Sequence, residues 1–158
     1  GFPLSACVGR ADVMDAAWPA SEGEAIHTST FLGHPVGCAM ALAQIRQLER
    51  RHLPERAEAL GACLATGLRQ AAQAASATRF RARTRSIGLM GGLELRHRDD
   101  RPAGSVALGV VQRLLAQGFV FLPEGNHGEV ISLTPPLTIP EKELSRALAA
   151  LGKEISLC

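Results

Sequence analysis

Lysine is nearly missing from this sequence of 158 residues. Of its 17 basic residues only Lys142 and Lys153 are lysines, and both lie near the end. Tyrosine is absent altogether. Any chemistry that needs an amine side chain must therefore use one of these two lysines or a lysine outside this sequence.

Cysteine clusters and long apolar runs are also lacking. The four cysteines, Cys7, Cys38, Cys63 and Cys158, form no CxxC or CxxH pattern, which argues against a zinc site or a redox pair. Scattered thiols suit a reducing compartment. No apolar run approaches the ~20 residues of a membrane span, and no signal-peptide layout opens the chain. We expect a soluble, cytoplasmic protein with no membrane partner.

The charge is small and evenly spread. The net charge is +2, and arginines along the whole chain carry it rather than one basic block. The concentrated basic surface of a nucleic-acid-binding protein is missing, so we expect no such partner. With 46% hydrophobic and 20% charged residues, the chain has the composition of a globular protein.

Helices separated by loops are expected in the first part of the chain. Pro35 suits the first position of a helix that extends to about His52, and Pro54 begins another helix with one apolar stripe. Ahead of them we expect a short strand at Ala6–Val8 and a helical turn at Asp12–Ala17.

The rest of the chain alternates strands and helices. Expected strands are Arg79–Arg83, Gly88–Leu95, Phe119–Leu122 and Glu129–Leu133, with a turn at Pro123–Gly128. One helix ends at Gly118, and the last begins at a Thr138–Glu141 capping box and stops at Gly152. From about residue 53 this order predicts an α+β layer with helices on one small antiparallel sheet.

A hydroxyl-rich loop precedes Pro35. His27 to His34 contains Thr28, Ser29 and Thr30. Hydroxyls beside a helix N-terminus suit an oxyanion or phosphate site, because both supply hydrogen-bond donors. They also suit a simple helix cap. The histidines lack partners at ligand spacing, so we expect no metal site.

Arginines at every second position, from Arg79 to Arg85, place their side chains on one face of a strand. That face is either a solvated sheet edge or an anion-binding surface. The sequence contains no GxSxG, HExxH, Walker or GxGxxG motif.

Four ordered segments carry a resemblance to a known family. They are Gly1–Ala6 (GFPLSA), His27–Pro35 (HTSTFLGHP), Arg85–Met90 (RSIGLM) and Leu133–Ile139 (LTPPLTI). In this order and spacing the chain resembles the class III aminotransferases, the ornithine, acetylornithine and ω-amino-acid type, which depend on pyridoxal phosphate (PLP).

The resemblance implies the C-terminal part of a fold-type I PLP transferase, of α/β class. Residues 1–50 would then be the end of the large cofactor domain with its crossover helix, and residues 51–158 the small α+β domain. The family forms its Schiff base on a lysine shortly before the Gly-Phe-Pro segment, so that lysine is expected upstream of Gly1. No catalytic residue is therefore expected within the chain.

The resemblance also implies binding residues. Thr30, supported by Ser29, would donate to the cofactor phosphate of a neighbouring subunit, which implies a homodimeric parent. Where many members have a carboxylate-binding arginine, this chain has Ser132. A serine cannot form the paired bonds of a guanidinium, so Arg85 on the neighbouring strand is a candidate replacement. His34 stands where the family has an asparagine.

The function that follows is transfer of an amino group between an amine or amino acid and an oxo acid. We expect the chain alone to be inactive because the Schiff-base lysine is missing. Two alternatives stay open: a mutase, racemase or lyase of the same fold, and a non-catalytic small domain that acts as a binding or dimerisation module.

Overall fold

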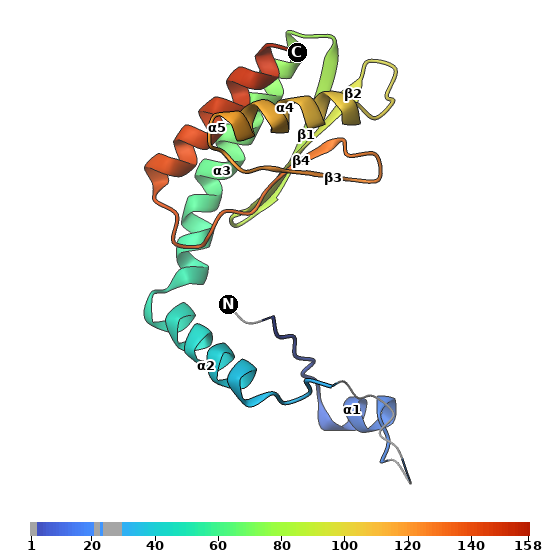
Figure 1. The fold of residues 1–158 in the computed structure, drawn as a ribbon, viewed down its shortest axis with the longest axis vertical. Coiled ribbons are helices and arrows are strands. Elements are labelled where there is room, and N and C mark those ends of the chain that lie inside the picture. Colours follow the sequence, from blue (N-terminus) through green and yellow to red (C-terminus); the bar gives the residue numbers. More distant parts are fainter. Residues whose placement is uncertain (1–2, 21–22, 24–29) are drawn as a thin grey trace. The chain divides into compact units, whose positions relative to one another are not determined.

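The computed structural model describes residues 3–20, 23 and 30–158 (Figure 1). The chain divides into two compact units, Gly1–Arg51 and His52–Cys158. Each unit is described by itself.

Two helices make up the regular structure in the described part of the first unit. Helix α1 covers Ala11–Ala17 and α2 covers Pro35–Arg50, as the sequence predicts. The expected strand at Ala6–Val8 is wrong: the segment is irregular and pairs with no strand in the described part of the chain. Val8 is 92% exposed, so no neighbour supports an extended ladder there.

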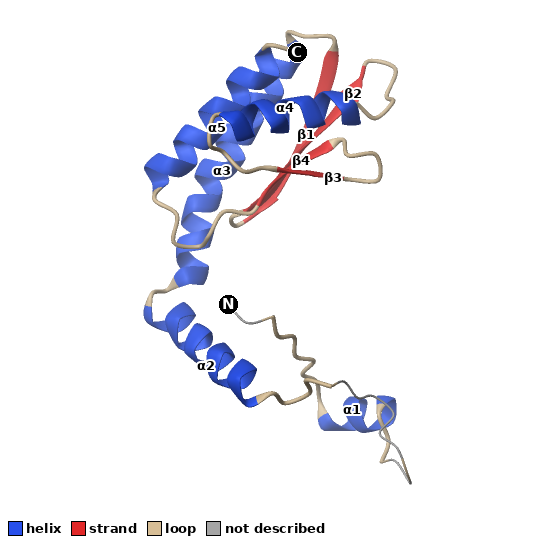
Figure 2. Ribbon diagram, viewed as in Figure 1, coloured by secondary structure: helices blue, strands red, loops and turns tan. Residues whose placement is uncertain are grey.

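The second unit is a four-stranded antiparallel sheet with three helices (Figure 2). Its elements are α3 (Leu53–Ser76), β1 (Phe80–Ile87), β2 (Met90–His97), α4 (Gly104–Ala116), β3 (Leu122–Glu124), β4 (Val130–Leu133) and α5 (Glu141–Ser156). The strand order is β1-β2-β4-β3. The predicted α+β arrangement of helices on one small sheet is confirmed.

One hydrophobic core joins the helices to one face of the sheet. Helix α3 supplies Leu64 and Leu68, and the strands supply Leu93 and Ile131, all fully buried. Side chains alternate along a strand, so the residues between these core positions lie on the opposite face. That opposite face faces away from the helices.

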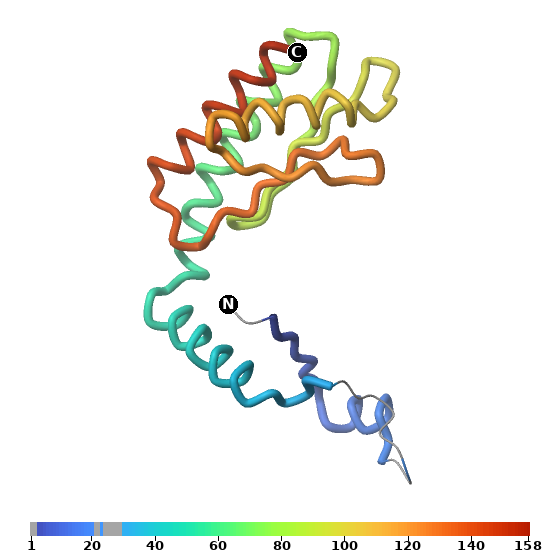
Figure 3. The backbone as a smooth tube through the Cα atoms, in the orientation of Figure 1, coloured from blue at the N-terminus to red at the C-terminus, as the bar shows by residue number. Residues whose placement is uncertain are grey.

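Glycines allow two close approaches in this unit. Gly88, with φ 50°, turns the chain between β1 and β2. A Cβ added at Gly61 of α3 would lie 2.7 Å from the Gly88 carbonyl oxygen, so the helix packs directly on this hairpin. At the end of α4, Gly118 adopts φ 85°, and the next amide, of Phe119, donates to the Leu114 carbonyl. This is a Schellman motif, and Figure 3 traces the chain through it.

The expected strands Arg79–Arg83 and Gly88–Leu95 have the wrong ends. Strand β1 continues to Ile87 and β2 covers Met90–His97, because the two strands pair along their whole length on either side of the turn at Gly88.

Three further predicted boundaries are wrong. The α5 N-cap is Pro140 without a side-chain cap, so Thr138 does not form the capping box. The helix passes through Gly152 and Lys153 to Ser156, since burial of its last turn outweighs the weak helix propensity of one glycine. Strand β3 begins at Leu122 rather than ending there, because its register is set by pairing with β4.

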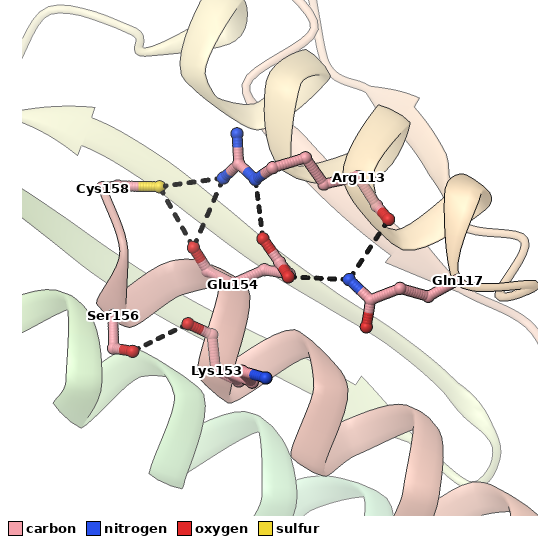
Figure 4. Close-up of polar contacts among 6 residues, drawn as sticks. All are labelled: Arg113, Gln117, Lys153, Glu154, Ser156 and Cys158. Carbon is pink, nitrogen blue, oxygen red and sulfur yellow. Dashed lines mark hydrogen bonds and ion pairs between the residues drawn. The ribbon is translucent and has the colours of Figure 1, made fainter.

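A buried carboxylate explains why α5 continues. Glu154 is 5% exposed and accepts hydrogen bonds from Arg113 Nε at 2.6 Å and Gln117 Nε2 at 2.7 Å, both at the end of α4 (Figure 4). The bond from Arg113, with that from Gln117, holds the pKa of the Glu154 carboxyl below its ordinary value, although burial opposes the shift. The pair ties α4 to the last turn of α5.

Candidate functional site

The first part of the site is the turn before α2. Thr30 is exposed at its start, and Gly33 closes it with φ 66°. The His34 amide donates to the Phe31 carbonyl at 3.1 Å, and the two rings meet edge to face at 5.9 Å between centroids. Ser29, the second cofactor-binding candidate, lies outside the described residues.

A histidine caps α2 in place of the expected hydroxyl. The Nδ1 atom of His34 accepts from the Gly37 amide at 3.3 Å. Among the described residues Thr30 forms no such cap, so its hydroxyl is not needed at the N-terminus of α2. The histidine that replaces the family's asparagine therefore still caps the helix, and Thr30 is available for another role.

The second part of the site is a row across the sheet. Arg85 of β1 pairs with Gly92 of β2, and Gly92 pairs with Ser132 of β4. Directly opposed residues of antiparallel strands point to the same face. In the next row, Leu93 and Ile131 are fully buried in the core, so Arg85 and Ser132 lie on the face away from the helices.

These two residues line one pocket. It has a volume of about 310 Å³, and its walls include Arg85, Ser132, Met90 and Glu124. The Arg85 and Ser132 backbones are two strand spacings apart, roughly 10 Å. Gly92 between them carries no side chain, so the space over the sheet stays open. The structure thus brings together both substrate-binding candidates of the second unit.

Glu124 is the site residue that the sequence did not reveal. It was expected in a turn, but it belongs to β3 and pairs with Val130. It therefore points to the same face as Arg85. The sequence gives little sign that Glu124 belongs to a strand. A strand of three residues, Leu122–Glu124, is too short to show the alternation of apolar and polar side chains by which strands are recognised.

The arginines of β1 lie on the exposed face of an edge strand, as their spacing predicts. Arg81, Arg83 and Arg85 are all exposed. Arg83 has a distant ion pair with Asp100 at 3.9 Å, whereas Arg96 on β2 is held by Glu94 at 2.6 Å. Among the described residues Arg85 forms no ion pair, so its guanidinium can bind an anion without breaking one.

The two lysines lie on α5, outside the walls of the Arg85 pocket. Lys142 is in the first turn of α5 and Lys153 in its last, and both are exposed. Neither lines the Arg85 pocket. The described residues also contain no group of three or more histidine, cysteine or acidic side chains able to hold a metal ion.

None of the helices in the described part of the chain has both the length and the apolar character of a membrane span.

Comparison with known families matches residues 1–155 to the family described as Aminotransferase class-III. The chain belongs to the class III aminotransferases. The predicted resemblance is therefore confirmed. The segments around Thr30, Arg85 and Ser132 all lie within the matched range.

Individual relatives agree with the family. The chain is 34% identical over 155 residues to the 5-aminovalerate aminotransferase DavT of Pseudomonas aeruginosa, covering 97% of this chain and 34% of that protein. It is 35% identical over 156 residues to the acetylornithine aminotransferase of Methanothermobacter thermautotrophicus, covering 99% and 35%. The chain thus spans about a third of the length of the curated relatives it matches.

A solved structure supports the fold. The acetylornithine aminotransferase of Elizabethkingia anophelis superposes with a TM-score of 0.74 at 28% identity, over 93% of this chain and 33% of that one. The predicted fold class, that of the aminotransferases with a small antiparallel sheet, is confirmed.

Proposed function

We propose that this chain is the C-terminal part of a PLP-dependent aminotransferase, which transfers an amino group between an amine or amino acid and an oxo acid. The observation that carries the proposal is the family match over residues 1–155. Residues 1–50 would belong to the large cofactor domain and residues 51–158 to the small domain.

Two residues of the chain, Thr30 and Ser29, are the candidates for binding the cofactor phosphate. When bound, PLP serves as an electron sink for the bonds at the amino-bearing carbon. Thr30 is exposed on the turn before α2 and does not cap that helix. Its hydroxyl would donate a hydrogen bond to the cofactor phosphate, supported by the preceding residue in the sequence, Ser29. Since Thr30 would serve a neighbour's cofactor, the parent would be a homodimer.

Substrate binding would use the open face of the sheet. The Arg85 guanidinium would bind a substrate carboxylate, and the Ser132 hydroxyl would contribute one hydrogen bond. A serine gives neither the charge nor the fork of a guanidinium, so carboxylate recognition would depend on Arg85 alone.

The covalent part of the chemistry would come from a lysine outside this sequence. Lys142 and Lys153 are exposed on α5 and line no wall of the Arg85 pocket. The 158-residue chain would consequently show no amino transfer by itself. The four cysteines, all free, suit the reducing cytoplasm we propose as its location.

The proposal is tested on the complete open reading frame that encodes these residues. We expect the frame to continue upstream of Gly1 with a lysine shortly before it. Borohydride reduction of the complete protein with PLP should fix the cofactor on that lysine, and the protein should pass amino groups from a donor to an oxo acid. Stoichiometric fixation on Lys142 or Lys153, or a start codon directly before Gly1, would overturn the proposal. The latter result would favour a non-catalytic binding module.

The role of Thr30 has its own control. Thr30→Ala should weaken PLP binding to the complete protein, because a phosphate donor is lost. Thr66→Ala is the matched change on the exposed face of α3, outside both parts of the site, and should leave PLP binding unchanged.

A second candidate reaction rests on Ser132. A mutase, racemase or lyase of the same fold does not need to bind two carboxylic substrates in turn, so it can do without the arginine at this position. A screen of amino acceptors distinguishes the two, because an aminotransferase converts an added oxo acid and the other enzymes do not.

A further inference from the structure

Arg85 and Glu124 lie on opposite sides of one pocket. Arg85 is on β1 and Glu124 on β3, the two outer strands of the sheet. Their strands are three spacings apart, roughly 14 Å. Both residues line the same cavity of about 310 Å³, with Gly92 and Ser132 of the inner strands between them. A ligand that binds Arg85 and extends across the sheet therefore approaches Glu124.

Neither of these two charges has an ion-pair partner in the described part of the chain. The ion pairs there include neither Arg85 nor Glu124. By contrast, Glu94, in the same row of the sheet as Glu124, accepts a hydrogen bond from Arg96 Nε at 2.6 Å. The pocket thus offers one unpaired cation and one unpaired anion to a ligand.

The rest of the described lining of this pocket is uncharged. Ile87, Met90 and Val130 are apolar, and Ser132 adds one hydroxyl. The apolar side chains can contact the carbon chain of a ligand. A second acidic group on the ligand finds no cation in these walls besides Arg85.

The pocket disfavours a ligand with two carboxylates. Arg85 can bind one of them through charge-assisted hydrogen bonds. The other would extend towards Glu124, and like charges repel each other at close range. An arginine at position 132 would supply a second cation, whereas the hydroxyl of Ser132 does not offset this repulsion. A neutral or positively charged group at the far end of the ligand avoids it.

We propose that Glu124 determines specificity in this pocket by repelling the second carboxylate of dicarboxylic acids. The site then takes monocarboxylic acids whose far end is neutral or cationic. This inference rests on the proposed function and narrows its oxo-acid substrate to the monocarboxylic class.

The test is an NMR titration of the 158-residue chain with hexanoate, adipate and 6-aminohexanoate. These probes share a six-carbon chain and one carboxylate, and their far ends are neutral, negative and positive. The chain lacks the proposed Schiff-base lysine, so binding is measured without amino transfer. The amides of residues 85, 92, 124 and 132 should shift.

We expect 6-aminohexanoate to bind most tightly and adipate about threefold more weakly than hexanoate. The effect is modest because Arg85 and Glu124 are both exposed in this chain. It should appear although adipate has two carboxylates that could each bind Arg85. In about 1 M salt the ratios should fall towards one, because the Debye length shrinks to about 3 Å.

Four variants assign the effect to individual residues. Glu124→Gln should remove the differences between the three probes, because it removes the charge and keeps the shape of the side chain. Glu58→Gln removes an exposed carboxylate of α3 that lies outside this pocket, and it should leave the order of binding unchanged. Arg85→Gln should weaken binding of all three probes. Ser132→Arg should reverse the order of hexanoate and adipate.

Equal or undetectable binding of the three probes would overturn the inference, as would a Glu124→Gln variant that keeps the original order. Loss of the order in Glu58→Gln would also overturn it, because the selection would then come from the net charge of the chain. Failure here would leave amino transfer by the complete protein to its own test. Conversely, selective binding without amino transfer would retain the role of Glu124 in the pocket and reject the proposed reaction.

Discussion

The two units of this chain differ sharply in how much they bury. In the second unit, Leu64, Leu68, Leu93 and Ile131 are fully buried in one core. In the described part of residues 1–51 only Gly37 is buried. Large apolar side chains such as Leu42 and Ile45 on α2 are about half exposed, at 54% and 49%.

This difference indicates which unit buries enough apolar surface to fold by itself. Folding must offset roughly 1–2 kcal/mol of backbone entropy per residue, and buried apolar surface is the main source of that energy. The second unit has such a source. The first unit has little, as expected for residues that belong to a larger domain in our proposal.

The largest difference between the units is expected for a leucine-to-alanine substitution made once in each of them. Leu68→Ala on α3 should lower the free energy of unfolding by about 3 kcal/mol, because it removes a fully buried side chain. Leu42→Ala on α2 should change it by less than about 0.5 kcal/mol. Urea unfolding measures both. Similar losses would show that α2 is packed in solution.

A glycine pair tests the close packing within the second unit. Gly61→Ala should cost about 2 kcal/mol, since the new methyl meets the Gly88 backbone. Gly109→Ala on α4 meets only the end of the Arg113 side chain at 3.4 Å, and it should be neutral or stabilise by up to about 1 kcal/mol. A harmless Gly61→Ala would mean that the hairpin can move away from α3.

The buried carboxylate of α5 gives a pH-dependent difference. Glu154→Gln should lower the free energy of unfolding by about 1–2 kcal/mol at pH 7. Because the folded pKa of Glu154 is lowered from 4.5, its contribution is complete above pH 4.5 and is lost as the pH falls through the folded value. Unfolding curves of wild type and variant should therefore converge in acid.

The control for this change is Glu143→Gln. Glu143 pairs with Arg146 on the same helix, but both side chains are about half exposed. Its loss should cost less than about 0.5 kcal/mol at any pH. A constant gap between wild type and Glu154→Gln from pH 7 to pH 3 would contradict the assigned pKa direction.

The smallest effect is expected at Thr30. Thr30→Ala should change the free energy of unfolding by less than about 0.5 kcal/mol, because the side chain is exposed and caps no helix. Its effect should appear only in PLP binding by the complete protein. A clear loss of stability would assign the hydroxyl a structural role in the first unit.

The sequence predicted the helices and strands of the second unit because the periodicity of their apolar residues matches their packing. It did not predict where several of these elements begin and end. Gly152 stays helical because Glu154 and Ile155 are buried one turn later. Thr138 does not cap α5, because Arg56 holds the carbonyls on either side of it. These contacts join residues far apart in the chain.

The site was predictable in part for the same reason. The family resemblance identified Arg85 and Ser132 as candidates, and their shared face follows from a strand register that no local pattern specifies. Glu124 was missed because pairing with β4, rather than its own neighbours, makes its segment a strand. The structure does not test Ser29, which lies outside the described residues.

Native-state amide hydrogen exchange on the full chain tests the contrast between the units most directly. The amides of Leu64, Leu93 and Ile131 should exchange only through global unfolding of the second unit. The amides in the middle of α2, from Leu42 to Ile45, should exchange at a far smaller opening free energy. Equal protection of α2 and the core of the second unit would contradict the account.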